Sequence, residues 1–307
     1  MLDLLKSLSD PCRLRLVAIL LHSELTVQEL TCILRMGQSR ISRHLKILSD
    51  AGVMTVKRQG TWSYYRVGDG NPFFNALRPA FERELETLPE RNGDMAALAL
   101  VLEERRKRSQ EFFDRHARQW DELARTLLPV PDYLGRLLEQ VPEATTLLEI
   151  GIGTGGLLLE LSKRAERVIG VDHAPAMLEE ARRRLDREGI TDIELRLGEM
   201  THLPLPDASV DCVVANMVLH HAAEPGSVLH EIQRVLLPGG LLILADLARH
   251  ERESAREQLA DQWLGFEESE LSLWLSSAGF VDVGCERIEG TAGQEAVLLV
   301  QSKKQTI

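Results

Sequence analysis

The sequence of 307 residues is poor in cysteine and in aromatic side chains, and it contains no long apolar run. The cysteines form no Cys-x-x-Cys pair, so neither a disulfide framework nor a compact zinc site is expected. No stretch approaches the roughly 20 uncharged residues that a membrane helix needs, and the N-terminal residues lack the order of a secretory signal. We therefore expect a cytoplasmic protein with no membrane association and no bound metal. Its four cysteines are Cys12, Cys32, Cys212 and Cys285.

Positive charge is scarce overall but not everywhere. The net charge is −11, yet residues 1–70 carry ten basic and six acidic side chains, a net of +4. The other 237 residues carry 26 basic and 41 acidic side chains, a net of −15. A small basic region attached to an acidic body suggests a nucleic-acid-binding domain followed by a second domain.

The first 50 residues predict a series of short helices. A Ser-Asp-Pro sequence at 9–11 is typical of a helix start. Thr26 is expected to cap a short helix, with Glu29 in the position of a capping box. After a turn at 36–39, Ile41, Leu45 and Leu48 share one helical face. This second helix has an opposite face rich in hydrogen-bond donors, so the pair predicts a helix-turn-helix.

Two strand-like segments follow, Val53–Lys57 and Ser63–Val67, joined by a basic hairpin tip at 58–61. Such a tip, called a wing, suits contact with the DNA backbone, and the donor-rich helix suits the major groove. A winged helix that makes only protein contacts is the alternative. The predicted contacts to an operator in double-stranded DNA are Gln38, Ser39, Arg40, Ser42, Arg43, His44, Lys46, Lys57 and Arg58.

Residues 8–67 resemble the ArsR-type winged-helix repressors, notably in SLSDPCRLRLVAIL, QSRISRHLKILSDAGV and RQGTWSYYRV. The resemblance implies a homodimer. Many members bind metal through two thiols in a Glu-Leu-Cys-Val-Cys-Asp-Leu segment, but here Thr26 and Gln28 occupy the thiol positions. That metal site is therefore absent. Cys12 and Cys32 are interpreted as small buried apolar side chains, with metal ligation as the alternative.

A connector is predicted between the two domains. A helix begins at Pro72 and carries an apolar side that the ArsR resemblance assigns to the dimer interface. Turn residues at 88–94 suggest the end of the first domain. A charged helix from Met95 to about Gln110 is interpreted as a solvated linker, with a further DNA contact as the alternative. The segment Phe112–Asp121 resembles the leading helix that small-molecule methyltransferases fold over their cofactor, and an aromatic pair that is only part of the core is the alternative.

The remainder alternates strands and helices from 146 to 245, which predicts a parallel sheet with its ligand at the carboxyl ends of the strands. The strand Thr146–Ile150 leads into a Gly-Ile-Gly-Thr-Gly-Gly turn and a helix through 157–165. Glycines there allow close approach to a ligand, although nicotinamide and flavin sites share this pattern. Asp172 ends the next strand, 21 residues after Gly151, where a carboxylate can bind ribose hydroxyls.

The segments LLEIGIGTGG, VIGVDHAPAML, GEMTHLPLPDASVD and RVLLPGGLLIL, in this order, resemble class I S-adenosylmethionine-dependent methyltransferases over about residues 110–300. Within that class, the likeness is to small-molecule methyltransferases of the quinone-biosynthetic type. The resemblance implies a doubly wound, Rossmann-like, seven-stranded α/β domain that binds S-adenosylmethionine or S-adenosylhomocysteine. The implied contacts are Glu149, Gly151, Gly153 and Gly155 for the methionine part, Asp172 for ribose, His173 and Met177 beside adenosine, Glu199 and Met200 for adenine, and Asn216 near the sulfonium.

Methyl transfer needs mainly alignment, and a base only when the acceptor must lose a proton. His220 and His221, shortly after the expected strand Val210–Ala215, are the candidate catalytic bases, with surface or capping histidines as the alternative. No cysteine cluster suited to arsenite is present.

We therefore expect a winged helix-turn-helix domain over 1–92, a helical connector and lid over 93–140, and a methyltransferase domain over 141–307. Three functions remain open. The cofactor could be an effector of a transcriptional regulator, or the protein could be an active methyltransferase for a small-molecule acceptor. Methylation of DNA or of DNA-bound protein is the third, and it is disfavoured because the strand end at Asn216 lacks an Asn/Asp-Pro-Pro-Tyr-like motif.

Overall fold

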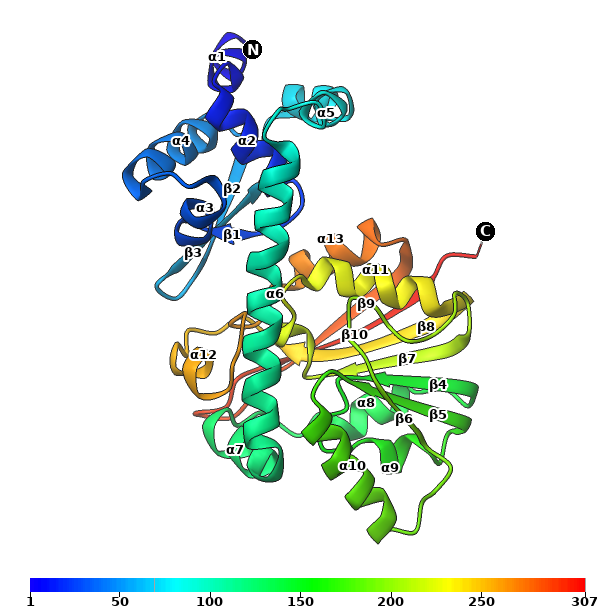
Figure 1. Cartoon of the computed structure of the whole chain (residues 1–307). Coiled ribbons are helices and arrows are strands. Elements are labelled where there is room, and N and C mark those ends of the chain that lie inside the picture. The colour runs from blue at the N-terminus through cyan, green and yellow to red at the C-terminus, as the bar shows by residue number, and fades with distance from the viewer. Residues whose placement is uncertain (69, 307) are drawn as a thin grey trace. The chain divides into compact units, whose positions relative to one another are not determined.

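The computed structural model describes residues 1–68 and 70–306, so Asp69 and Ile307, which fall inside the expected first and third segments, lie outside the described residues. The chain forms two compact units, Met1–Arg105 and Arg106–Ile307, and the elements of each are labelled in Figure 1. In the described part of the chain, no helix is long and apolar enough to cross a membrane.

The N-terminal unit begins with four short helices, as the sequence predicts. The caps follow the expected chemistry: Asp10 accepts a hydrogen bond from the backbone of Arg13, and Thr26 forms a full capping box with Glu29. A core of aliphatic side chains from all four helices holds them together. The helices are α1 (Leu2–Leu8), α2 (Pro11–Leu20), α3 (Val27–Leu34) and α4 (Gln38–Asp50).

The wing is shorter at its tip than the sequence indicated. Strands β2 (Met54–Gln59) and β3 (Trp62–Val67) pair up to Gln59 and Trp62, which leaves a two-residue turn at Gly60 and Thr61. The predicted four-residue tip at 58–61 is therefore wrong, because Arg58 and Gln59 continue the strand. A short strand β1 (Leu25–Thr26), not expected from sequence, pairs with β3 and places the sheet beside α3.

Two helices follow the wing. Helix α5 (Pro72–Leu85) begins at Pro72 as expected, with Asn71 as its cap. Helix α6 (Arg91–His116) is longer than the predicted Met95–Gln110 and includes the boundary between the units. The first part of α6 belongs to the N-terminal unit because its Leu98 and Leu102 are buried in that core. The boundary between the two units therefore lies later in the chain than the turn residues at 88–94 suggested.

The second unit contains a seven-stranded sheet in the order β6-β5-β4-β7-β8-β10-β9. Strands β4 to β8 are parallel, and β10 is antiparallel to both of its neighbours. This confirms the predicted Rossmann-like α/β fold. The strands are β4 (Ala144–Ile150), β5 (Ala165–Asp172), β6 (Glu194–Leu197), β7 (Val210–Asn216), β8 (Leu236–Leu247), β9 (Phe280–Ile288) and β10 (Val297–Lys304).

Helices cover both faces of this sheet (Figure 1). The predicted helix over 157–165 is shorter in the structure, since it ends at Leu161, turn residues follow at 162–164, and β5 begins at Ala165. The region before the sheet forms a 3-10 turn, η1 (Ala117–Gln119), and α7 (Trp120–Leu127). The remaining elements are α8 (Leu134–Gln140), α9 (Leu158–Leu161), α10 (Pro175–Arg187), η2 (Leu219–His221), α11 (Pro225–Val235), α12 (Ser254–Gln258) and α13 (Glu268–Ser277).

Candidate functional site

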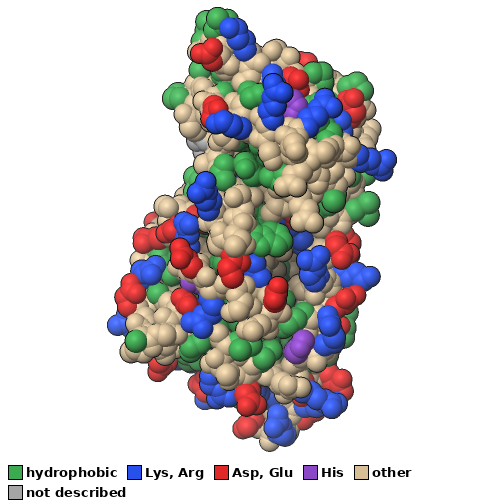
Figure 2. All heavy atoms as spheres, turned by 90° about the vertical axis from the view of Figure 1, so that its left-hand side faces the viewer, with side chains coloured by type: hydrophobic (Ala, Val, Ile, Leu, Met, Phe, Trp, Pro, Cys, Tyr) green, Lys and Arg blue, Asp and Glu red, His purple; other side chains and the backbone are tan. Residues whose placement is uncertain are grey.

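Helix α4 has the two faces that a DNA-reading helix needs. Ile41, Leu45 and Leu48 are fully buried and fix the helix against the N-terminal core. On the face of the molecule shown in Figure 2, Lys and Arg side chains stand out on the N-terminal unit. The exposed side chains of α4 include most of those predicted to contact DNA, namely Gln38, Ser39, Arg40, Ser42, Arg43 and Lys46.

The nine residues predicted to contact DNA do not all lie on one exposed face. In the wing, Arg58 is exposed and Lys57 half-buried. His44 is buried, because its position follows the spacing of the apolar stripe of α4 rather than that of the polar face. Burial, assisted by Arg13 and other nearby arginines, lowers the pKa of His44 although Asp10 opposes the shift. A buried, neutral imidazole is unsuited to phosphate contact, so this assignment is corrected.

The cysteines of the N-terminal unit also differ from expectation. Cys32 is exposed and Cys12 is half-buried, so neither is the buried apolar side chain predicted from sequence. Cys212, in contrast, is fully buried in the seven-stranded sheet.

In the second unit, Glu149 lies near the carboxyl end of β4, at the edge of the sheet where the parallel strands end. It is 2% exposed, and its Oε2 atom has no hydrogen-bond partner. Burial, with the Asp172 carboxylate nearby, raises the pKa of Glu149 to about 8. A buried carboxylate with an unsatisfied oxygen is costly. The ammonium group of an amino-acid moiety is the kind of partner that would satisfy it.

The glycine turn after β4 requires its glycines. Gly151 has a φ of +63°, and a Cβ there would lie 2.1 Å from a methyl carbon of Val218. Asp172, at the end of β5, accepts a hydrogen bond from the backbone N–H of Gly153 at 2.9 Å and one from Ala174 at 2.9 Å. The turn and the ribose-binding candidate are thus held together as one unit. Gly155 has a φ of +76° and packs against α10.

A pocket opens beside these strand ends. Its lining includes His173, Glu199 and Met200, which were predicted to surround the adenosine. Burial opposes protonation of His173, but Asp172 outweighs it and raises the pKa of this histidine. Met177, also predicted here, is 1% exposed and packs in a cluster with Phe113. The pocket is further lined by Arg106, Ser109, Thr201, His221, Ala222, Ala223 and Val228.

Asn216 ends β7, where the sulfonium contact was predicted. Its Oδ1 atom accepts a hydrogen bond from the Tyr133 hydroxyl at 2.8 Å. Tyr133 is almost fully buried, and burial raises the pKa of its phenol. The Asn216 amide is therefore oriented by a residue that carried no signal in the sequence.

The segment from the end of α6 through α7 covers the site and is called here the lid (residues 106–127). Phe113 contacts the rings of His173, His221 and Trp120. An added Cβ on Gly153 would lie 3.8 Å from the indole of Trp120. The indole of Trp120 thus lies against the glycine turn.

Polar contacts fasten this lid. The Thr154 hydroxyl donates to Asp121 at 2.6 Å, and the Ala176 backbone N–H donates to Asp114 at 3.0 Å. Gln110 donates through its side-chain amide to the His173 carbonyl oxygen at 3.0 Å.

The two candidate bases are buried in η2. His220 Nδ1 lies 2.7 Å from Asp246 Oδ1, and His220 Nε2 lies 3.7 Å from Asp261 Oδ1. Burial disfavours the charged imidazole, but the two carboxylates outweigh it and raise the pKa of His220 to about 9. Burial and the neighbouring His220 lower the pKa of His221. The histidines are therefore neither surface nor capping residues, and only His221 of the two lines the pocket.

The two carboxylates of this cluster, Asp246 and Asp261, were not predicted from the sequence. Asp246 is fully buried and also accepts the backbone N–H of Leu219 at 2.8 Å, so it shapes the η2 turn. Its place directly after the predicted region of alternating strands and helices, 146–245, was an available signal. Asp261 is buried in a loop, where burial raises its pKa to about 7 against the opposing charge of His220. No pattern in the sequence marks it.

Comparisons with known families cover both units. Residues 10–56 match the bacterial regulatory proteins of the arsR family, and residues 148–244 match the family described as a methyltransferase domain. The methyltransferase match, with the buried Glu149 and Asp172 at the strand ends, indicates S-adenosylmethionine or S-adenosylhomocysteine as the ligand of the second unit.

Several curated proteins are similar over part of the chain. A 37.1 kDa uncharacterized protein in transposon TN4556 of Streptomyces fradiae is 41% identical over 102 residues, 32% of this chain and 29% of that protein. The arsenite methyltransferase of Halobacterium salinarum is 36% identical over 107 residues, 34% of this chain and 27% of that protein. The malonyl-(acyl-carrier protein) O-methyltransferase of Yersinia pestis is 31% identical, over 57% of this chain and 58% of that protein. The similarity thus spans less than two thirds of each relative.

Solved structures agree on the fold. A SAM-dependent methyltransferase from Aquifex aeolicus superposes with a TM-score of 0.50 at 26% identity, covering 62% of this chain and 97% of that one. A SAM-dependent methyltransferase from Thermotoga maritima has a TM-score of 0.53 at 22% identity, covering 64% of this chain and all of that one.

Proposed function

Because the chain joins an arsR-family DNA-binding region to a methyltransferase domain, we propose that it is a homodimeric transcriptional regulator that binds operator DNA. In this proposal S-adenosylmethionine or S-adenosylhomocysteine is the effector. The observation that carries the proposal is helix α6, which contributes buried side chains to both units.

The first part of α6 is built into the DNA-binding unit. Leu98 and Leu102 lie in its core, and the Arg105 guanidinium forms an ion pair with Glu29 at 2.7 Å. Both side chains of this pair are largely buried, so the charged run at 103–108 is not the fully solvated linker predicted from sequence. Glu29 also closes the capping box of α3, the first helix of the helix-turn-helix.

The second part of α6 belongs to the lid over the cofactor site. Gln110 and Phe113 contact His173 or its backbone, next to Asp172, the residue predicted to bind ribose. A ligand that favours one position of the lid therefore acts on α6. The first part of the same helix is packed into the core of the N-terminal unit, which contains the helix-turn-helix. Coupling between sites needs such an element with two arrangements that both ligands bias.

Two further features support this proposal. The thiols that trigger many ArsR-type repressors are replaced, and Thr26 serves as a helix cap, so the attached cofactor domain is the available source of a signal. Phe73 and Leu77 on α5 are exposed apolar side chains. Such a face fits the dimer contact that the family resemblance implies, and native mass measurement tests the dimer.

The test is DNA affinity with and without cofactor. DNA selected from a random pool is titrated with the full chain alone, with S-adenosylmethionine, and with S-adenosylhomocysteine. We expect at least one cofactor form to change the DNA dissociation constant by about 5-fold or more. The variant Asp172→Asn should lose this response, and the matched variant Asp186→Asn on the surface of α10 should keep it. Equal DNA affinity in all three conditions refutes the effector role.

The second candidate is a methyltransferase for a small acceptor, and the position of His221 favours it. This imidazole lines the pocket, and its lowered pKa keeps it neutral and able to accept a proton from an acceptor. Arsenite is a poor candidate acceptor, since Cys212 is buried in the sheet and Cys285 is the only other cysteine of this unit. Release of S-adenosylhomocysteine with a panel of acceptors tests this candidate, and turnover that His221→Phe abolishes would support it.

A further inference from the structure

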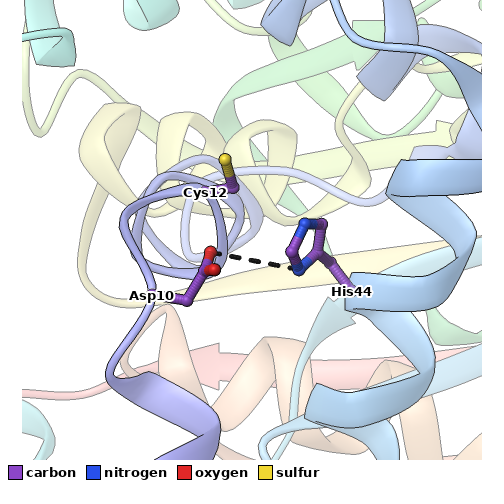
Figure 3. A group of neighbouring side chains, drawn as sticks. All are labelled: Asp10, Cys12 and His44. Atoms are coloured by element: carbon purple, nitrogen blue, oxygen red, sulfur yellow. Dashed lines mark ion pairs between the residues drawn. The ribbon is translucent and has the colours of Figure 1, made fainter.

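Three side chains with different ligand atoms meet where α2 begins beside α4 (Figure 3). Asp10 caps α2, Cys12 lies in its first turn, and His44 comes from the middle of α4. One oxygen, one sulfur and one ring nitrogen of these residues all lie within 4.8 Å of one another. None of them belongs to the Glu24–Leu30 segment where the ArsR resemblance would place metal ligands.

The His44 ring supplies a second, independent observation at this site. His44 is 8% exposed, and its Nδ1 atom has no hydrogen-bond partner. Asp10 Oδ1 lies 3.9 Å from this nitrogen, within ion-pair range but beyond hydrogen-bond distance. In Figure 3 the imidazole and the carboxylate face each other across this gap. A buried nitrogen left without a partner costs free energy that a ligand between these groups would recover.

We propose that Asp10, Cys12 and His44 form a binding site for a divalent metal ion of the zinc type. Zinc accepts sulfur, nitrogen and oxygen ligands in tetrahedral geometry. With bonds of about 2.0–2.3 Å, its ligand atoms are about 3.3–3.8 Å apart. The three atoms here lie within 4.8 Å of one another and must come closer together to reach that spacing. A thiolate and a carboxylate balance the charge of the ion, and water completes the fourth position.

The surroundings give the ion access and a route to the DNA-binding helix. Asp10 and Cys12 are half-buried, so solvent reaches the site from one side. Arg40 Nη2 now donates a hydrogen bond to Cys12 Sγ at 3.3 Å. A metal ion on this sulfur would displace the Arg40 guanidinium, which is one of the exposed DNA-facing groups of α4. Metal occupancy would thus act on the DNA-facing surface independently of the cofactor.

The second His and carboxylate cluster, at His220, His221 and Asp261, also brings possible ligand atoms together. It contains no thiol, so the absorption of bound cobalt separates the two clusters. Thiolate-to-cobalt charge transfer gives a near-ultraviolet band only where a cysteine binds the ion.

The experiment adds Co²⁺ to the reduced full-length chain and follows the near-ultraviolet and visible absorption. Zinc affinity is then measured by competition with a chromophoric chelator. The variants are Cys12→Ser and His44→Gln, and Cys32→Ser is the matched control because it removes the other cysteine of the same unit. Circular dichroism verifies that each variant is folded.

We expect a thiolate band that saturates at one Co²⁺ per chain, that Cys32→Ser retains and that Cys12→Ser abolishes. His44→Gln and Cys12→Ser should each weaken Zn²⁺ binding by more than the about 10–100-fold that loss of an outer-shell partner typically costs. The proposal is overturned if the wild-type chain shows no thiolate band, if Cys12→Ser keeps the band, or if Cys32→Ser removes it.

Discussion

Replacing Glu149 by glutamine should stabilise the cofactor-free protein and weaken cofactor binding at the same time. The carboxylate is buried, and its Oε2 atom has no hydrogen-bond partner, so its charged form is disfavoured in the folded state. Its pKa rises from the usual 4.5 of a glutamate to about 8. At about 1.4 kcal/mol per pKa unit, the ionised group costs about 5 kcal/mol of folding free energy above pH 8.

The sign of the pH dependence follows from the raised pKa. Below pH 4.5 the carboxyl is protonated in both the folded and the unfolded chain, and it costs nothing. Between pH 4.5 and pH 8 the unfolded chain loses the proton first, so the wild-type stability falls as the pH rises. Glutamine does not titrate, so the stability advantage of Glu149→Gln should grow over this range.

Urea unfolding at pH 5 and pH 8.5 measures this difference. Three of the four tryptophans, Trp120, Trp263 and Trp274, lie in the second unit, so fluorescence reports mainly on that unit. At pH 8.5 the variant should also bind S-adenosylhomocysteine about 30-fold more weakly or worse, because a buried charge pair is worth about 2 kcal/mol or more. A stability difference that is the same at both pH values would refute the argument that Glu149 is an unsatisfied buried carboxylate.

Three other predictions concern the lid, the DNA face and the histidine cluster. Thr154→Val removes the hydroxyl that donates to Asp121 and should weaken S-adenosylhomocysteine binding about 10-fold in calorimetry. The loop control Thr291→Val should leave this affinity unchanged. Equal affinities of the wild type and Thr154→Val would show that this contact does not hold the lid. Arg43→Ala should reduce the slope of log affinity for DNA against log salt by about 1, and Arg287→Ala on β9 should not; an unchanged slope would remove Arg43 from the interface. His220→Gln should destabilise the protein most below pH 6.5, and progressively less as the pH rises through about 9, because the raised pKa of His220 makes its charged form stabilising. Urea unfolding measures this cost. A loss of unfolding free energy that does not vary between pH 6 and 9.5 would contradict the ion pairs with Asp246 and Asp261.

The residues at the strand ends were predictable because a parallel sheet brings the ends of its strands to one edge. Glu149, Asp172 and Asn216 each follow an apolar run, and that local pattern is enough to place them. Asp261 and Tyr133 come from segments without periodicity. Only tertiary packing brings them to the site, so no local pattern could reveal their roles.

In the N-terminal unit, the predictions that were wrong concerned mainly charged and titratable side chains. His44 was grouped with the polar face of its helix, although it lies three residues from Ile41 and four from Leu48, on the buried stripe. Arg105 stood in a charged run that suggested solvation, but its partner Glu29 is 76 residues away in sequence. A sequence read for local patterns does not reveal such distant partners.

Reciprocal binding offers the most direct test of the proposal that the cofactor is an effector. Calorimetry measures the affinity of the full chain for S-adenosylhomocysteine, first alone and then saturated with selected DNA. Because coupling between two binding sites is symmetric, DNA must change the cofactor affinity by the same factor that the cofactor changes DNA affinity. We predict a change of about 5-fold or more, corresponding to about 1 kcal/mol of coupling. Identical cofactor affinities with and without DNA would contradict the account.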